Sequence, residues 1–128
     1  YRPAPYSKEY VESTLRRLSC LGPSKVVLTG VAFDGRQVGS ASYDRSTDEI
    51  SYALSDTVDG YFHGTGDVFA SALLGAYMNG LSLAESARIA VDYTHGCIVR
   101  TKEADTDLRY GVDFEHGIPD LLRQTGII

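Results

Sequence analysis

Apolar residues in the first part of the chain recur at the spacing of a helix. Val11, Leu15 and Leu18 would lie on one face of that helix, and Ser7 stands where an N-cap residue is needed. The pattern breaks at Gly22, which is typical of a helix end. The sequence therefore predicts a short amphipathic helix between these two signals.

The next segments have the patterns of strands. Residues 25–30 (KVVLTG) form a continuous apolar run, which predicts a strand buried on both faces of a helix-covered sheet. Residues 38–43 and 50–54 alternate with a period of two around the polar link 44–48, which predicts a more exposed β-hairpin. One buried strand does not make a sheet, so an α/β sheet of this kind would need parallel neighbours from elsewhere.

The second half of the chain has helical patterns. Residues 65–79 are apolar or small nearly all round, which predicts a helix buried on every side. Ser82 and Glu85 have the spacing of a capping box at the start of the next helix. Asp113 is suited to cap a last helix, which Pro119 would bend or split into two short turns.

Composition narrows the class of protein. The 128 residues suit one domain, with residues 1–6 as a Pro-punctuated linker, and the apolar (43%) and charged (23%) fractions are those of an ordinary globular protein. A net charge of −5 without any basic run argues against a nucleic-acid or anionic-membrane partner. No apolar stretch has the length of a membrane span.

Cysteine and histidine usage gives no sign of a metal site. Cys20 and Cys97 lack the spacing of a zinc motif, and both lie in apolar helical patterns, so we expect two buried free thiols in a reducing, cytoplasmic compartment. The three histidines have no pair at helical spacing, so we expect no metal ligand among them.

The segment Gly64-Thr65-Gly66-Asp67 carries the most chemical information. A glycine-rich turn at the start of a helix offers free backbone N–H groups and the positive end of the helix dipole to a phosphate. An aspartate in the first helical turn could then accept a proton from an attacking hydroxyl. The alternative is an ordinary loop with a dipole-stabilising acid, but the apolar helix that follows favours the functional interpretation.

A family resemblance follows from these residues. The segment 62–73 (FHGTGDVFASAL) resembles the signature of the ribokinase superfamily and within it is most similar to the vitamin B6 (pyridoxal) kinases. Residues 26–30 (VVLTG) are similar to the strand whose terminal threonine meets the nucleotide phosphates. Residues 87–101 look like the helix that flanks the adenine pocket.

The resemblance implies a ribokinase-like three-layer α/β fold, of which this chain has the C-terminal, nucleotide-binding part. It implies that Asp67 is the catalytic base for the 5′-hydroxymethyl group of pyridoxal, pyridoxine or pyridoxamine. It also implies ATP and Mg²⁺ as cofactors, with Mg²⁺ bridging the phosphates. Gly64, Thr65 and Gly66 would form the anion hole for the γ-phosphate, and Thr29 and Gly30 would touch the ATP phosphates. A homodimer is compatible with it.

This chain differs from the family's pattern in two ways. Family members are roughly twice this length, as large single α/β domains are. Their first half supplies the vitamin pocket, several parallel strands and an Asn-x-x-Glu motif associated with magnesium, and none of these is found in residues 1–128. We therefore expect that this chain by itself could be inactive.

Several other functions stay open. Hydroxymethylpyrimidine kinases belong to the same superfamily but commonly have Cys at the position of Asp67. Sugar and nucleoside kinases more often have Ala at the position of Thr65. Outside the enzymes, the chain could be a truncated, non-catalytic nucleotide-binding fragment or a structural α/β domain without a ligand.

Overall fold

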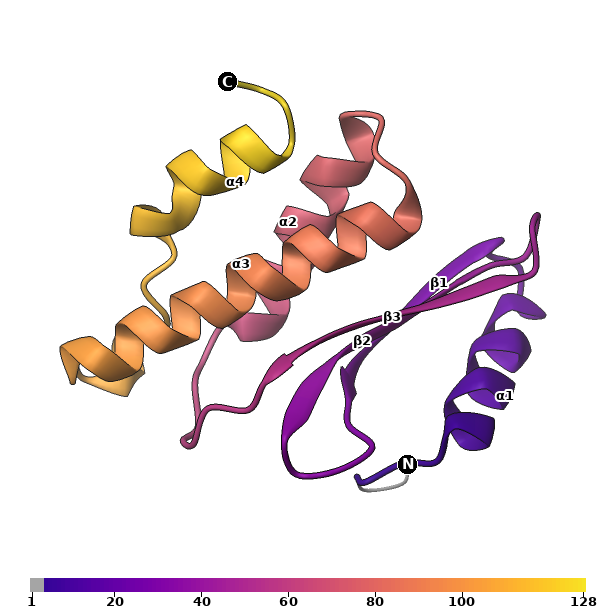
Figure 1. The fold of residues 1–128 in the computed structure, drawn as a ribbon, viewed down its shortest axis with the longest axis horizontal. Coiled ribbons are helices and arrows are strands. Elements are labelled where there is room, and N and C mark those ends of the chain that lie inside the picture. Colours follow the sequence, from indigo (N-terminus) through magenta and orange to yellow (C-terminus); the bar gives the residue numbers. More distant parts are fainter. Residues whose placement is uncertain (1–3) are drawn as a thin grey trace. The chain divides into compact units, whose positions relative to one another are not determined.

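A computed structural model describes residues 4–128, which form two compact units, one up to Thr57 and one from Val58 to Ile128 (Figure 1). The first unit contains one helix and three strands: α1 (Lys8–Ser19), β1 (Lys25–Val31), β2 (Gln37–Asp44) and β3 (Glu49–Asp56). The second unit is helical: α2 (Thr65–Met78), α3 (Leu83–Ala104), the 3₁₀ turns η1 (Leu108–Tyr110) and η2 (Glu115–Gly117), and α4 (Ile118–Gln124). This content confirms the predicted α/β class, whereas one domain over residues 1–128 stays a prediction.

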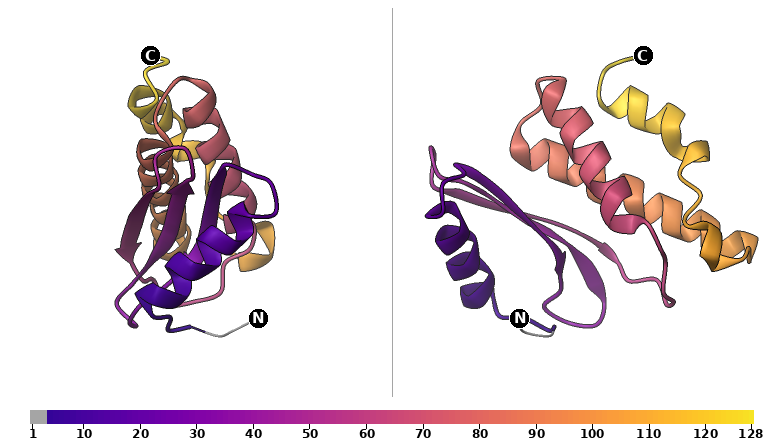
Figure 2. Two further views of the ribbon diagram at one scale, coloured as in Figure 1. Left: turned by 90° about the vertical axis from the view of Figure 1, so that its right-hand side faces the viewer. Right: turned by 180° about the vertical axis from the view of Figure 1, so that it is seen from behind.

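The first helix forms as predicted. The Ser7 hydroxyl accepts a hydrogen bond from the Tyr10 amide (3.2 Å), which caps the N-terminus of α1. Val11 and Leu15 are buried, and they pack in one cluster with Val31, Ala41 and Tyr43 of the sheet. Helix α1 thus lies on one face of the sheet within this unit (Figure 2). Of the predicted linker, residues 1–3 lie outside the described part of the chain.

The three strands form one antiparallel sheet in the order β1–β2–β3. The hairpin β2–β3 is confirmed, with Asp44 opposite Glu49 at its turn. The predicted burial is wrong: β1 is only partly buried over residues 25–28 and exposed at residues 29–30, while residues 40–43 of β2 are buried. The reason is position in the sheet, because β2 lies between two strands and β1 pairs on one side only.

Helix α2 packs along α3 in the second unit (Figure 2). Its buried residues are Phe69, Ala72 and Ala76, which share one face. The prediction of a helix buried on every side is therefore wrong, since Leu74 is 61% and Met78 is 75% exposed. An apolar sequence allows burial, but only neighbouring elements bury a face, and in this chain they cover one face of α2.

The capping box and the proline of the later helices act as predicted, whereas the predicted cap by Asp113 is wrong, because the N-cap residue of α4 is Gly117. The Ser82 side chain accepts from the Glu85 amide and the Glu85 carboxylate accepts from the Ser82 amide, so the capping box is present. Pro119 divides the last segment as expected, because η2 stops at Gly117 and α4 starts at Ile118 with proline in its first turn.

The two cysteines differ. Cys97 is buried as predicted, and burial raises the pKa of its thiol. Cys20 is exposed, so the prediction of two buried thiols is wrong for this residue. Cys20 is the C-cap of α1 and lies one position beyond Ser19, the last buried residue of that helix.

None of the helices between residues 4 and 128 combines the length and apolar character that a membrane crossing requires.

Candidate functional site

The N-terminus of α2 brings Gly64, Thr65, Gly66 and Asp67 together in a single turn. Gly64 is the N-cap residue and has a φ of 84°, a left-handed conformation that favours glycine. No side chain caps this helix end, and the first backbone bond of the turn runs from the Val68 amide to the Gly64 carbonyl (3.1 Å). The amide groups ahead of Val68 are therefore available to an anion at the positive end of the helix dipole.

The turn is open to a ligand. A Cβ atom built on Gly64 or on Gly66 would meet no atom within 4 Å, and both glycines are exposed. Neither glycine is therefore needed to make room for a neighbouring protein atom. Gly64 is explained by its backbone angle, while Gly66 is suited to the close approach of a ligand from outside.

Asp67 stands in the first turn of α2 with an exposed side chain. Its carboxylate is near the same helix end that presents the free amide groups, so one turn combines an anion-binding element and a proton acceptor. This arrangement suits a reaction in which a hydroxyl group attacks a bound phosphoryl group.

Thr29 and Gly30 belong to the first unit, where both are exposed at the end of β1. The pairing with β2 shifts register here, from Thr29 opposite Ser40 to Val31 opposite Gly39, so Gly30 is the extra residue of a β-bulge. Gly30 has a φ of 66°, which this kind of bulge requires. The bulge explains the glycine on structural grounds, and contact of Thr29 and Gly30 with phosphates stays a prediction.

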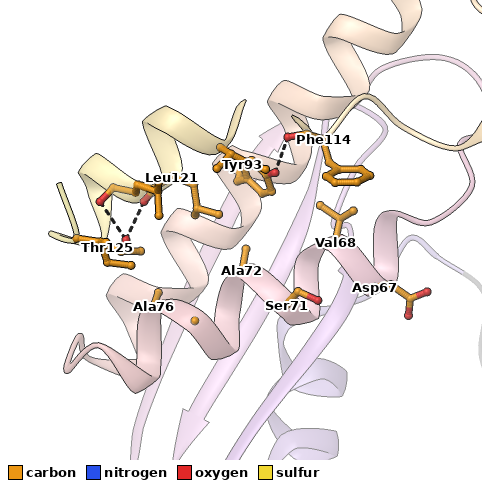
Figure 3. A pocket seen from close by; sticks show the side chains of 13 residues that line it. Asp67, Val68, Ser71, Ala72, Ala76, Tyr93, Phe114, Leu121 and Thr125 are labelled. Carbon is orange, nitrogen blue, oxygen red and sulfur yellow. Dashed lines mark hydrogen bonds between the residues drawn. The ribbon is translucent and has the colours of Figure 1, made fainter. Parts of the chain in front are cut away.

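A groove that the sequence did not predict runs along α2 between α3 and α4 (Figure 3). Its volume of about 510 Å³ lies in the range of small-molecule sites. Figure 3 shows Asp67 and Phe114 at one end of the groove and Thr125 at the other. The lining is mostly apolar, and Asp67 is its one carboxylate among the described residues.

Helix α3 holds the aromatic end of this groove in place. The Tyr93 hydroxyl donates to the Phe114 carbonyl (2.6 Å), and burial raises the pKa of Tyr93, so the phenol stays a donor.

The Thr101 hydroxyl accepts from the Asp113 amide (2.7 Å), and Arg100 donates to the Asp113 carbonyl (3.1 Å). The Asp113 carboxylate contacts His116, which holds the pKa of that carboxyl below its usual range. The result is a fixed backbone that keeps Phe114 beside Val68 and Asp67 (Figure 3).

Sequence reasoning missed Tyr93 and Phe114 as neighbours of Asp67. Their positions in the chain have ordinary helical spacing, and no motif marks them. The contact between Tyr93 and Phe114 joins residues 21 positions apart, so only the packed helices show it.

Across residues 4–128, no three His, Cys, Asp or Glu side chains gather into a group that could hold a metal ion. A divalent ion at this turn would therefore depend on phosphate oxygens, which Mg²⁺ accepts readily as ligands.

The sequence profile of the phosphomethylpyrimidine kinase family matches residues 3–111. Because this match spans most of the chain, the chain belongs to that family. No curated protein matches the chain.

Solved structures agree with this family. A Bacteroides thetaiotaomicron protein assigned as a phosphomethylpyrimidine kinase is 27% identical, with a TM-score of 0.86 over 93% of this chain and 41% of its own. Its orthorhombic crystal form with pyridoxal gives 26% identity and a TM-score of 0.84, over 93% of this chain and 42% of that one. Pyridoxal kinase from Lactobacillus plantarum is 25% identical, with a TM-score of 0.81 over 96% of this chain and 43% of its own. The chain thus spans less than half the length of these structures.

Proposed function

We propose that this chain is the nucleotide-binding part of an ATP-dependent kinase that phosphorylates the 5′-hydroxymethyl group of pyridoxal, pyridoxine or pyridoxamine. The observation that carries the proposal is the open turn at the start of α2, with free amide groups, two unobstructed glycines and Asp67. Family membership supports a phosphotransferase. The likeness to a pyridoxal kinase and to a crystal form with pyridoxal supports the B6 substrates.

Each residue of the turn has a separate role in this proposal. The backbone amides of Gly64, Thr65 and Gly66 bind the γ-phosphate and stabilise the negative charge that develops on it during transfer. The Asp67 carboxylate accepts the proton of the attacking hydroxyl as the new oxygen–phosphorus bond forms. Thr29 and Gly30 contact the other ATP phosphates.

Magnesium fits this site through the nucleotide. The described residues offer no cluster of three or more protein ligands, so phosphate oxygens of ATP would supply most of the ligands of this ion. When bound, Mg²⁺ neutralises the charge on the transferring group.

Hydroxymethylpyrimidine is the alternative substrate. The matching family profile is named for phosphomethylpyrimidine kinase, which is the observation in its favour. Both substrates present a hydroxymethyl group on an aromatic heterocycle, so the same turn and the same base serve either reaction. Competition between pyridoxal and hydroxymethylpyrimidine in a full-length kinase that contains this chain distinguishes them by the ratio of kcat/KM values.

Replacing Gly66 with valine tests the phosphate-binding turn. We expect the dissociation constant for Mg-ATP, measured by calorimetric titration of the 128-residue chain, to rise by about tenfold or more because a side chain blocks close approach to the amides. The fold should be kept, since a Cβ at residue 66 meets no protein atom within 4 Å.

The matched control is Gly75→Val in the same helix. Gly75 is also exposed with no atom within 4 Å of its Cβ position, so valine there measures the effect of a β-branched residue on this helix away from the turn. We expect the control to bind Mg-ATP like the wild type. Equal binding by the Gly66 variant would contradict the phosphate role. If the wild-type chain binds no Mg-ATP, the turn is not a working nucleotide site in this chain.

A further inference from the structure

The loop that leads into the phosphate-binding turn has few attachments. Residues 58–63 belong to no helix or strand. Within the described part of the chain, no backbone–backbone hydrogen bond ties them to another segment. Local contacts shape the loop instead, because the rings of Tyr61 and His63 meet edge to face with centroids 4.9 Å apart.

One hydrogen bond joins this loop to the far end of α3. The Lys102 ammonium group donates to the Asp59 carbonyl at 2.7 Å, across 43 positions of sequence. Lys102 lies in the last turn of α3, where a cation is also favoured by the helix dipole. The bonded carbonyl belongs to the peptide group that joins Asp59 to Gly60, so the lysine fixes the orientation of that peptide plane.

Two glycines, one in the loop and one in contact with it, also affect the conformation of the loop. Gly60 has a φ of 128°, and a Cβ there would lie 3.0 Å from the Phe62 ring. A Cβ on Gly111 would lie 3.6 Å from the His63 carbonyl oxygen, which is an ordinary contact distance, so residue 111 packs against the loop without crowding it. The positive φ of Gly60 favours this shape of the loop, and the Lys102 bond holds its outer end.

We propose that Lys102 is a positioning residue for the phosphate-binding turn. It holds the loop 58–63 against the end of α3, and the loop in turn delivers Gly64 in the left-handed conformation that exposes the amides of α2. Loss of this bond lets the loop sample other conformations, so the turn has to be ordered at the moment of ATP binding. The inference rests on the proposed function for its effect on ATP, and on the hydrogen bond alone for its effect on the loop.

The test compares Lys102→Met with the wild-type chain in two measurements. In the ligand-free protein, we expect the backbone nitrogen-15 order parameters of residues 58–63, measured by NMR relaxation, to fall from about 0.85, typical of a rigid backbone, to below about 0.6, because the charged hydrogen bond is lost. In calorimetric titration, we expect the Mg-ATP dissociation constant to rise by about tenfold, since part of the binding free energy orders the loop.

Two further variants separate positioning from charge. Lys102→Arg keeps a donor at the same place, so it should restore the wild-type order parameters and bring the Mg-ATP dissociation constant to within about twofold of the wild-type value. Asp59→Asn keeps the backbone carbonyl and changes only the carboxylate, so it should leave the order parameters unchanged.

Each result decides a different question. Unchanged order parameters in Lys102→Met overturn the inference, as do lower order parameters with unaltered Mg-ATP affinity. A wild-type chain that does not bind Mg-ATP contradicts the proposed function, and the order parameters then decide by themselves whether Lys102 holds the loop.

Discussion

Asp67→Asn lowers the kcat of a full-length kinase that contains this chain by about a thousandfold, because general-base catalysis contributes about 10²- to 10⁴-fold. Asparagine has nearly the same size and can still stand in the first turn of α2, but it cannot accept the substrate proton. The amide groups of the turn are unaltered, so we expect the Mg-ATP dissociation constant to change by no more than about threefold. A large loss in kcat without a loss in ATP binding would assign the residue to the chemical step.

The matched control is Asp120→Asn. Asp120 is also an acidic residue in the first turn of a helix, and it pairs with Arg123 on the surface of α4. Removing a carboxylate from a helix N-terminus has a modest general cost to stability, which this control measures. Phosphorylation of pyridoxal at the wild-type rate by the Asp67 variant would show that another group is the base.

Gly39→Ala destabilises the first unit by about 3 kcal/mol or more, at the upper end of the cost of overpacking. A Cβ on Gly39 would overlap the Ala53 carbonyl oxygen and lie 2.8 Å from the Leu54 Cα. Both atoms belong to the backbone of β3, which cannot move away without breaking the pairing between β2 and β3. Gly39 lies in the central strand, so the clash affects the whole sheet.

Urea denaturation followed by circular dichroism measures this effect. Gly35→Ala is the control, because a Cβ at residue 35 meets no atom within 4 Å and its backbone has no left-handed angle. We expect Gly35→Ala to have the wild-type midpoint or a slightly higher one, since alanine restricts the unfolded chain. A Gly39 variant as stable as this control would contradict the close approach of β2 and β3.

The sequence by itself predicted what local interactions control. The Ser7 cap, the capping box of Ser82 and Glu85 and the hairpin around residues 44–48 each depend on residues a few positions apart. Such features depend on hydrogen bonds and backbone preferences that neighbouring residues provide, so a pattern in the sequence is enough to find them. The turn 64–67 belongs to the same group, because its amides and its carboxylate come from one short segment.

Burial and long-range contacts were decided by the tertiary structure alone. Residues 25–28 look like a buried strand, yet β1 is less buried than β2 because pairing order, not hydrophobicity, places a strand in the centre of a sheet. The apolar surface of α2 is covered on one face only, which depends on where α3 packs. The groove beside Asp67, the contact of Tyr93 with Phe114 and the bond from Lys102 to Asp59 join distant segments. No local sequence pattern predicts such contacts, because these residues come together only when the helices pack.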